Sequence, residues 1–365
     1  MKETEIAIVG GGPAGLCAAY TAAASGAQVT LIERNPLMGG QLNKQTHMFF
    51  GSEKQYASTR GMDITNILLK QLEPYEGQVQ MINNTTVVGL YEDKVLSLLE
   101  NEERYYKLKP KTTIVATGAF EKFLAFPNND LPGIYGAGAV QTLMNVYGVK
   151  PGNKVLMVGA GNIGLIVSYQ LIQSGVEVVA IVDAASKIGG YLVHASKIRR
   201  LGIPILTNHS VKEARGEGVL EKVVISEVDQ SFKPIAGTEK EFEVDVMCIS
   251  VGLSPLNELL SMAGCMMKYV PSLSGFVPIR TSEYETSVKN LFVAGDSCGI
   301  EEASSAMVEG HLAGLYASAS IGKKHEQFVV LEKEYKKQLH DLRSGPEGEG
   351  IRRGLTAVER RSHND

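Results

Sequence analysis

The sequence has no pair of cysteines that could form a redox dithiol or ligate a metal ion together. Its four cysteines, Cys17, Cys248, Cys265 and Cys298, lie far apart, and no CxxC pair occurs among the 365 residues. No apolar run reaches the length of a transmembrane helix, and the first nine residues lead directly into a predicted strand rather than a signal peptide. These absences indicate a cytoplasmic protein with no metal site and no transmembrane segment.

The sequence also lacks a block of like charge. Its 36 Lys and Arg and 40 Asp and Glu give a formal net charge of −4, and the two signs are interspersed. A surface for nucleic acid is therefore not expected. The length exceeds that of one ordinary α/β domain and suits two.

A glycine motif near the N-terminus, Gly10-Gly11-Gly12-Pro13-Ala14-Gly15, organises the first part of the chain. It follows the apolar run 6–9, opens an alanine-rich segment over 14–24, and precedes a second apolar run that ends at Glu33. Strand, glycine turn, helix, strand and acid is the pattern of a dinucleotide-binding βαβ unit. The alternative, an ordinary glycine-rich loop, does not explain why the strand, helix and acid follow at these offsets.

Three glycines of the motif each have a physical task. Gly10 allows the tight turn, Gly12 lets backbone approach a pyrophosphate, and Gly15 lets helix and strand pack closely. The helix N-terminus directs free N–H groups and the positive end of its dipole at the phosphates. Glu33, followed by Arg34, is placed to accept hydrogen bonds from ribose hydroxyls.

The same pattern returns 149 residues later, which predicts a second dinucleotide unit. Gly10, Gly12 and Gly15 recur in a motif that again follows an apolar run, and its strand ends at Asp183. The second motif comprises Gly159, Ala160, Gly161, Asn162, Ile163 and Gly164. Gly252, after the buried strand 246–251, is expected at the same site.

The first unit is expected to hold FAD. A distant Gly295-Asp296 would complete its site, because FAD is long enough to span a whole domain, and Asp296 would accept from a ribitol hydroxyl. The helix that follows would aim its first amides, near Ser304, Ser305 and Ala306, at the flavin pyrimidine edge. The alternative for Gly295-Asp296 is a turn with a helix cap.

The second unit is expected to hold NAD(H). Asp183 suits a free ribose 2′-hydroxyl and repels a 2′-phosphate, and only Lys187 among residues 184–190 is basic, so NADH is favoured over NADPH. The alternative is a relic site that packs well and binds nothing.

These patterns predict an α/β protein with two Rossmann-like three-layer domains, the second inserted in the first. Each domain is expected to carry a small antiparallel β-meander. Residues 1–119 and 275–322 would form the FAD domain and 120–274 the NAD(P) domain. Residues 323–365 would form a charged C-terminal helix, over 327–342, and a poorly packed tail.

With these motifs the chain resembles the flavoproteins with two dinucleotide-binding domains, the group of thioredoxin reductase and the pyridine nucleotide–disulfide oxidoreductases. The resemblance rests on the two glycine motifs, on Ala116-Thr117-Gly118, and on Ala294-Gly295-Asp296. It implies that Gly40, Gln41 and Leu42 lie beside the FAD and that Thr117 and Gly118 close over it. The redox cysteines of disulfide reductases are missing here, so a disulfide reductase is not expected.

A closer likeness is to the NAD(P)/FAD-binding subunits of hydrogen cyanide synthase, opine oxidase, dye-linked proline dehydrogenase and heterotetrameric sarcosine oxidase. It rests on Pro132-Gly133-Ile134, Gln141-Thr142-Leu143 and Glu301-Glu302-Ala303 with Glu309-Gly310. The likeness implies that the chain pairs with a second flavoprotein dehydrogenase as its partner subunit. An iron–sulfur centre, if the complex has one, would lie on a partner such as a small iron–sulfur subunit.

The leading hypothesis is an FAD-dependent NAD(P)H oxidoreductase that passes a hydride between NAD(H) and flavin, as one subunit of a heteromeric dehydrogenase. Its substrate would be an amino acid, amine, hydroxy acid or glycerol 3-phosphate. Two alternatives remain: an FAD-binding assembly or electron-relay subunit without turnover of its own, and a freestanding flavin oxidase or dehydrogenase. The catalytic residues are unassigned; Lys44 and His47 are candidates, with a purely structural His47 as the alternative.

Overall fold

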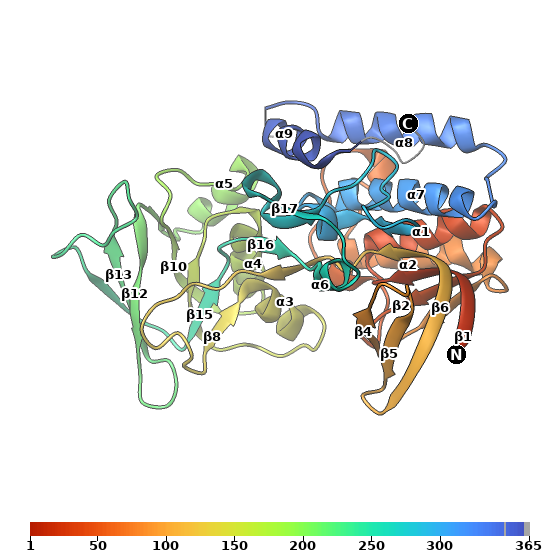
Figure 1. Cartoon of the computed structure of the whole chain (residues 1–365). Helices are drawn as coiled ribbons and strands as arrows, with labels where there is room; N and C mark the ends of the chain where they lie inside the picture. Colours follow the sequence, from red (N-terminus) through yellow and green to blue (C-terminus); the bar gives the residue numbers. More distant parts are fainter. Residues whose placement is uncertain (347, 361–365) are drawn as a thin grey trace. The chain divides into compact units, whose positions relative to one another are not determined.

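The computed structural model describes residues 1–346 and 348–360 and divides the chain into two compact units (Figure 1). Unit 1 contains residues 1–120 together with the described residues from 253 onward, and unit 2 contains residues 121–252. Unit 2 is therefore inserted into unit 1. The chain passes between them at 120/121 and 252/253.

Unit 1 is built on a seven-stranded sheet in the order β3-β2-β1-β6-β5-β4, with β19 also paired to β6. Strands β1, β2, β3, β6 and β19 run parallel to their neighbours, while β4, β5 and β6 form an antiparallel meander. The long strand β6 belongs to both parts. The strands are β1 (Lys2–Val9), β2 (Val29–Ile32), β3 (Val79–Ile82), β4 (Thr85–Leu90), β5 (Leu96–Glu100), β6 (Arg104–Val115) and β19 (Leu291–Val293).

Helices and short strands complete unit 1. The helices are α1 (Pro13–Ala24), α2 (Gly61–Leu72), α6 (Glu258–Met262), α7 (Ala303–Ser320), α8 (Phe328–Leu342) and α9 (Glu349–Val358), with the 3-10 turns η1 (Gly40–Lys44), η2 (Glu53–Gln55), η3 (Glu73–Tyr75), η4 (Pro271–Leu273) and η5 (Gly295–Cys298). An antiparallel pair is formed by β17 (Met267–Val270) and β18 (Gly275–Pro278). A separate two-stranded sheet contains β7 (Ala119–Glu121) and β16 (Leu253–Pro255).

Unit 2 repeats the plan with a five-stranded, wholly parallel sheet in the order β11-β10-β9-β15-β8. A separate antiparallel meander contains β12, β13 and β14. The strands are β8 (Ile134–Gly136), β9 (Lys154–Val158), β10 (Glu177–Asp183), β11 (Ile205–Thr207), β12 (His209–Arg215), β13 (Lys222–Glu227), β14 (Lys240–Glu243) and β15 (Val246–Ile249), and the helices are α3 (Ala137–Asn145), α4 (Asn162–Gln173) and α5 (Leu192–Arg200). The predicted fold, with one meander in each unit, is confirmed.

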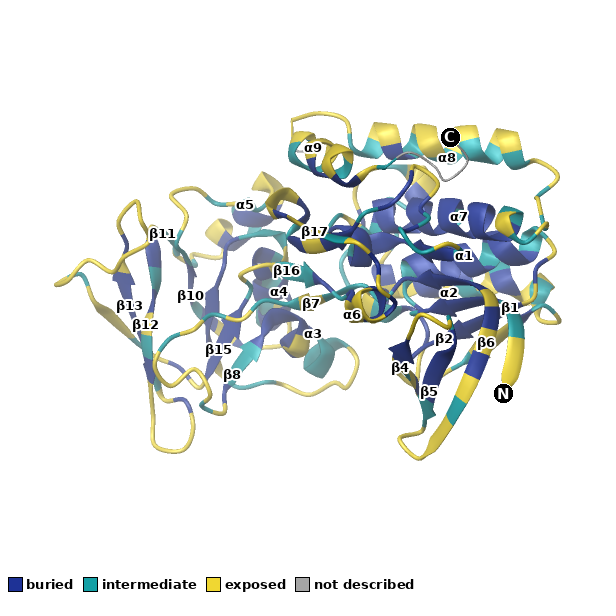
Figure 2. Cartoon of the chain, in the orientation of Figure 1, coloured by how far each residue is buried: buried dark blue, intermediate teal, exposed yellow. Residues whose placement is uncertain are grey.

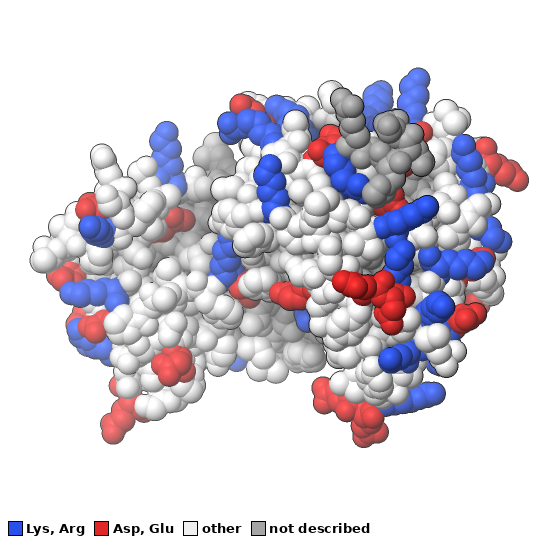
Figure 3. All heavy atoms as spheres, viewed as in Figure 1, with Lys and Arg blue, Asp and Glu red and all other residues white. Residues whose placement is uncertain are grey.

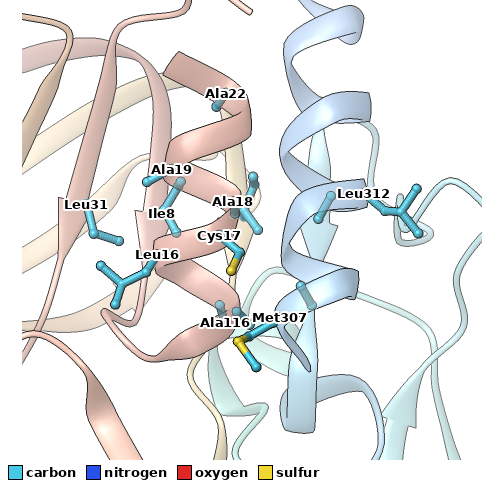
Figure 4. Close-up of a cluster of buried hydrophobic side chains, with 14 of the residues drawn as sticks. Ile8, Leu16, Cys17, Ala18, Ala19, Ala22, Leu31, Ala116, Met307 and Leu312 are labelled. Carbon is cyan, nitrogen blue, oxygen red and sulfur yellow. The ribbon is translucent and has the colours of Figure 1, made fainter. Parts of the chain in front are cut away.

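Helix α1 lies between the sheet of unit 1 and helix α7. Leu16 packs toward Ile8 and Leu31 of the sheet, and Cys17 lies toward Met307 of α7 (Figure 4). Helix α1 is therefore buried on two sides. This explains its many alanines, because larger side chains would not fit between the sheet and α7. Helix α7 is also buried along most of its length (Figure 2).

The closest approach of α1 and α7 depends on glycine. A Cβ at Gly310 would lie 2.1 Å from the carbonyl oxygen of Ala14, and one at Gly314 would lie 2.4 Å from that of Ala18. We therefore expect Gly310→Ala to force the helices apart and to lower the free energy of unfolding by about 3 kcal/mol. Chemical denaturation measures the change.

Gly350→Ala on α9 is the matched control for this prediction. A Cβ at Gly350 would lie 3.8 Å from the Cβ of Ser272, an ordinary contact, and alanine favours the helix over glycine. Its stability should be equal to or slightly above that of the unsubstituted protein. Equal stability of both variants would contradict the close approach of α1 and α7.

The compact units differ from the expected division at residues 274/275. Residues 253–274 group with unit 1, because Leu259, Leu260 and Cys265 are buried in the same cluster as Val9 and Val293 of its sheet. The chain therefore leaves unit 2 immediately after β15 and Gly252. The sequence placed the crossing too late because the short elements after Gly252 carry no strong periodicity.

The expected poorly packed tail is wrong for residues 349–358, which form α9. Val358 of α9 is buried against Val270, Leu273 and Val277, with Ile351 and Leu355 partly buried beside it. These apolar residues recur at helical spacing, a signal hidden by the high charge of the segment. The part of the predicted tail at 361–365 lies outside the described residues.

Acidic and basic side chains are interspersed over the face shown in Figure 3, consistent with the mixed charges of the sequence. Within residues 1–346 and 348–360, no helix is both long enough and apolar enough to cross a membrane.

Candidate functional site

The first glycine turn joins β1 to α1 under tight steric limits. Gly10 has φ +109°, and a Cβ there would lie 2.2 Å from the carbonyl oxygen of Ala116. A Cβ at Gly15 would lie 1.8 Å from the carbonyl oxygen of Gly10. Both positions therefore require glycine so that the turn and the first helical residues can pack on the sheet.

Gly12 is different, because the fold itself leaves room for a side chain there. Its backbone is extended at φ −76°, and the nearest atom that a Cβ would meet is the Cα of Gly40, 4.0 Å away. Gly12 precedes Pro13 and the first amides of α1. A space held open beside a helix N-terminus fits a pyrophosphate, so the residues present suit the predicted dinucleotide.

The acid of the first unit is held in place by backbone. Glu33 is buried, and its Oε2 accepts from the N–H of Gly11 at 2.8 Å while its Oε1 accepts from the backbone and side-chain amides of Asn35 at 2.8 and 2.7 Å. A carboxylate oxygen has a second lone pair, so Glu33 retains acceptor capacity for ribose hydroxyls. Arg34 beside it is exposed.

The loop after β19 lies against the same turn. A Cβ at Gly295 would lie 3.0 Å from the Cβ of Ala14 and 3.4 Å from that of Ala306. Helix α7 starts a few residues later, and Ser304, Ser305 and Ala306 are buried in its first turn. The structure therefore brings the N-termini of α1 and α7 together beside Gly295.

Asp296 lies in this loop, and its carboxylate accepts one long hydrogen bond there. Its Oδ1 accepts from the N–H of Glu301 at 3.4 Å, a long hydrogen bond. Burial is the largest cause that raises the pKa of Asp296 to about 7, and the neighbouring carboxylates of Glu309, Glu301 and Glu302 contribute to the rise, whereas the Glu301 amide opposes it. Asp296 is thus a carboxyl that would gain from a donor on a ligand.

This geometry predicts a pH-dependent destabilisation by Asp296. A raised pKa means that the ionised form is penalised only in the folded chain, so the penalty grows from about pH 4 and is complete above about pH 7. Without FAD, Asp296→Asn should therefore be more stable than the unsubstituted protein at pH 8 by at least about 1 kcal/mol after solvent screening. The gain should shrink toward pH 4. Thermal unfolding of both proteins across this range measures it, and a gain independent of pH would contradict the assignment.

The second glycine turn has the same geometry as the first. Gly159 has φ +110°, a Cβ there would lie 2.1 Å from the carbonyl oxygen of Ser250, and a Cβ at Gly164 would lie 2.0 Å from that of Gly159. Gly161 has φ −75°, and a Cβ there would meet no described atom within 4 Å. The space beside the α4 N-terminus therefore fits a second dinucleotide.

Asp183 occupies the position of Glu33. Its Oδ2 accepts from the N–H of Ala160 at 2.7 Å, and its Oδ1 accepts from the N–H of Ala185 at 2.8 Å. The repeat offset is 149 residues at the glycines but 150 residues at the acids. The extra residue is explained by a shift in the β9–β10 register between Val178 and Ala180, which is a β-bulge.

Gly190 lies against the second glycine turn, and the sequence analysis did not identify it. Its N–H donates to the carbonyl oxygen of Ala160 at 2.9 Å, and a Cβ there would lie 3.0 Å from the carbonyl carbon of Gly161. In the first unit, the N–H of Gly39 donates to Gly11 at 2.7 Å and Gly40 lies over Gly12. Extending the repeat at an offset of 150 pairs Gly39-Gly40 with Gly189-Gly190 and would have found it.

The remaining predicted residues occupy varied positions around the two turns. Leu42 is fully buried and serves packing, and Gln41 is exposed. Thr117 donates to the carbonyl oxygen of Leu256 at 2.5 Å.

Gly118 and Gly252 both have positive φ, at +78° and +115°, after the equivalent strands β6 and β15. Asn162 accepts from the N–H of Tyr191 at 2.8 Å, and Ile163 is partly exposed.

The two candidate catalytic residues lie at the end of η1 and in the loop that follows it. Lys44 ends η1, and the ring of His47 stacks on Phe49 with centroids 6.0 Å apart. The backbone of His47 and Met48 is also joined to the start of α2, since the carbonyl of His47 accepts from the N–H of Gly61 at 3.4 Å and Met48 bridges to Arg60. These contacts favour the structural interpretation of His47.

All four cysteines fall among the described residues, and each is buried and unpaired. Burial raises the pKa of the Cys17, Cys248 and Cys298 thiols well above the ordinary range, so a thiolate nucleophile is disfavoured at all three.

Two Rossmann units with matching glycine turns define a flavoprotein-type dinucleotide oxidoreductase. Residues 4–310 match the model of the pyridine nucleotide-disulphide oxidoreductase family, and the chain belongs to that family. Members of this family bind FAD and a nicotinamide nucleotide, and they are oxidoreductases. The resemblance predicted from the glycine motifs is thereby confirmed.

Three proteins illustrate what the chain is similar to. The alpha subunit of sarcosine oxidase from Corynebacterium sp. (strain P-1) is 28% identical over 336 residues, which are 88% of this chain and 33% of that protein. One of the subunits of opine oxidase from Agrobacterium tumefaciens (strain Ach5) is 24% identical, over 87% of this chain and 66% of that protein. The crystal structure of L-proline dehydrogenase from P. horikoshii matches with a TM-score of 0.68 and 22% identity, over 92% of this chain and 59% of that one.

The chain thus spans about a third of the sarcosine oxidase relative and about two thirds of the opine oxidase relative. Both relatives are named as subunits of larger enzymes. The match to L-proline dehydrogenase extends over both units and supports the fold.

Proposed function

We propose that the chain binds FAD in unit 1 and NAD(H) in unit 2, and that it passes a hydride between them as one subunit of a heteromeric dehydrogenase. The two cofactors supply the redox chemistry. The residues of the chain bind the phosphates at the N-termini of α1 and α4, orient the riboses through Glu33 and Asp183, and supply the α7 amides for charge on the flavin.

The observation that carries the proposal is the repeated turn. Gly12 and Gly161 are the glycines of the two motifs where the fold leaves space for a side chain, and both lie beside a helix N-terminus. Packing alone gives no reason for glycine there, whereas close approach of a pyrophosphate does.

Cofactor stoichiometry tests the proposal. Titration of the apo full-length chain with FAD, followed by NADH, should give one bound FAD and one bound NADH per chain. NADH should leave FAD in place at saturation. One dinucleotide per chain in total, or displacement of FAD by NADH, would contradict two separate sites.

The preference for NADH rests on Asp183. Its carboxylate lies at the end of β10 beside the Ala160 amide, where a 2′-phosphate would meet like charge. Asp183→Asn keeps the shape and removes the charge, so discrimination between NADH and NADPH should fall by about ten-fold with FAD content unchanged. Equilibrium binding of both nucleotides measures it. Unchanged discrimination would show that another group selects the nucleotide.

The partner is inferred from the relatives. Both curated relatives reported above carry the word subunit in their names, and this chain supplies no cysteine pair for electron transfer of its own. We propose that a second flavoprotein oxidises an amino acid, amine or hydroxy acid and exchanges electrons with this chain.

A further inference from the structure

A buried cluster of charges joins the C-terminal helices to the start of α7. Arg343 directly follows α8, and its guanidinium donates from Nε and Nη2 to the two carboxylate oxygens of Glu301 at 2.8 and 2.7 Å. The same Nη2 donates to Oε1 of Glu309 at 2.6 Å. The side chains are 12%, 9% and 3% exposed, respectively, so these contacts are shielded from water.

The second oxygen of Glu309 holds the loop that begins at Gly295. Oε2 accepts from the N–H of Gly295 at 2.9 Å and from the thiol of Cys298 at 3.3 Å. Arg280 adds a weaker contact to Oε1 at 3.4 Å, and its guanidinium lies 4.2 Å from the centre of the Tyr284 ring. Glu309 therefore connects Arg343 to the first residue of the loop.

Glu301 connects Arg343 to the other end of the same loop. Its N–H is the donor to Oδ1 of Asp296. Arg343 thus contacts both ends of the segment that carries Asp296. At one end it binds Glu309, which accepts from the N–H of Gly295, and at the other end it binds Glu301 itself. No residue of the βαβ units takes part in these contacts.

The pKa values of the two glutamates in the cluster depend on the neighbouring arginines. Burial alone would raise the pKa of Glu309, but Arg343 and Arg280 outweigh it and hold that pKa below the ordinary value. Burial and the charge of Glu309 raise the pKa of Glu301, and Arg343 opposes the rise. Without Arg343, Glu309 would keep the longer contact to Arg280 at 3.4 Å, and the buried carboxylate of Glu301 would lose both hydrogen bonds of the guanidinium fork.

We propose that Arg343 is a positioning residue for the loop 295–301, and through it for the flavin-facing carboxyl of Asp296. The inference rests on the proposed function for the role of Asp296, while the control of the loop by Arg343 stands on the contacts alone. The segment beyond α7 then belongs to the FAD site, although it lies outside the dinucleotide motifs.

Hydrogen exchange of the apo full-length chain tests control of the loop. Arg343→Met should increase the exchange rate of the peptide spanning 295–301 by about ten-fold, because its hydrogen bonds to Glu309 and Asp296 lose their support. Arg353→Met, at an exposed position of α9, is the control and should leave that rate unchanged. Equal rates in the two variants would overturn the proposal.

Arg343→Lys is the variant for the same measurement if Arg343→Met does not fold. Lysine retains the buried positive charge but cannot form the fork to Glu301, so exchange at 295–301 should rise by about three-fold. Exchange unchanged from the unsubstituted protein would overturn the proposal.

A double-mutant cycle on FAD binding tests the link to Asp296. Arg343→Met should raise the FAD dissociation constant about ten-fold in the unsubstituted chain and less than about three-fold in an Asp296→Ala background. Additive effects would overturn the link. If the unsubstituted chain binds no FAD while exchange still depends on Arg343, the proposed function fails and control of the loop by Arg343 stands.

Discussion

Gly12→Ala should abolish tight FAD binding and leave the fold intact. The added methyl group would lie 4.0 Å from the nearest atom, and the extended backbone at Gly12 suits any residue, so stability should change by less than about 1 kcal/mol. The same methyl group would occupy the space proposed for the pyrophosphate at the α1 N-terminus. We expect the FAD dissociation constant to rise by about 100-fold or more. Fluorescence titration of the apoprotein measures it.

Gly15→Ala is the contrasting variant from the same motif. Its Cβ would lie 1.8 Å from the carbonyl oxygen of Gly10, so this substitution should destabilise unit 1 itself. The two variants therefore separate loss of a ligand from loss of the fold. Normal FAD affinity in a well-folded Gly12→Ala protein would contradict the first site.

Gly161→Ala should have the second large effect, confined to the nucleotide of unit 2. Gly161 has an extended backbone, and the structure leaves the space around its would-be Cβ open to at least 4 Å among the described atoms. NADH affinity should fall by about 100-fold while FAD content stays at that of the unsubstituted protein. Flavin content and NADH binding, measured on one preparation, give both quantities.

The two glycine variants control for each other. Gly12→Ala should lose FAD and keep the NADH site, and Gly161→Ala should do the reverse, because the motifs lie in separate compact units. Loss of FAD in Gly161→Ala with NADH binding preserved would mean that the cofactors are assigned to the wrong units.

Much of this architecture follows from local sequence signals. The turns at Gly10 and Gly159 could be predicted because positive φ and carbonyl contacts below 2.5 Å leave glycine as the residue that fits. Glu33 and Asp183 could be predicted from their place at the end of the second strand. These positions are fixed by a single βαβ unit, so a short stretch of sequence contains the information.

Other features depend on contacts between distant segments and were missed. The return crossing near Gly252 is set by packing of residues 253–274 on unit 1, and α9 is stabilised by Val270 and Val277. The bond between Arg343 and Glu301 joins residues 42 positions apart. No local sequence pattern marks such a pair, since an arginine next to a charged helix usually faces solvent.

Anaerobic titration of the FAD-loaded full-length protein with NADH tests the central claim most directly. We predict that one equivalent of NADH per FAD removes the visible absorbance of the oxidised flavin, and that Gly161→Ala with FAD bound responds far more slowly. A protein that binds FAD stoichiometrically but keeps its visible absorbance with both NADH and NADPH would contradict hydride transfer between the two sites.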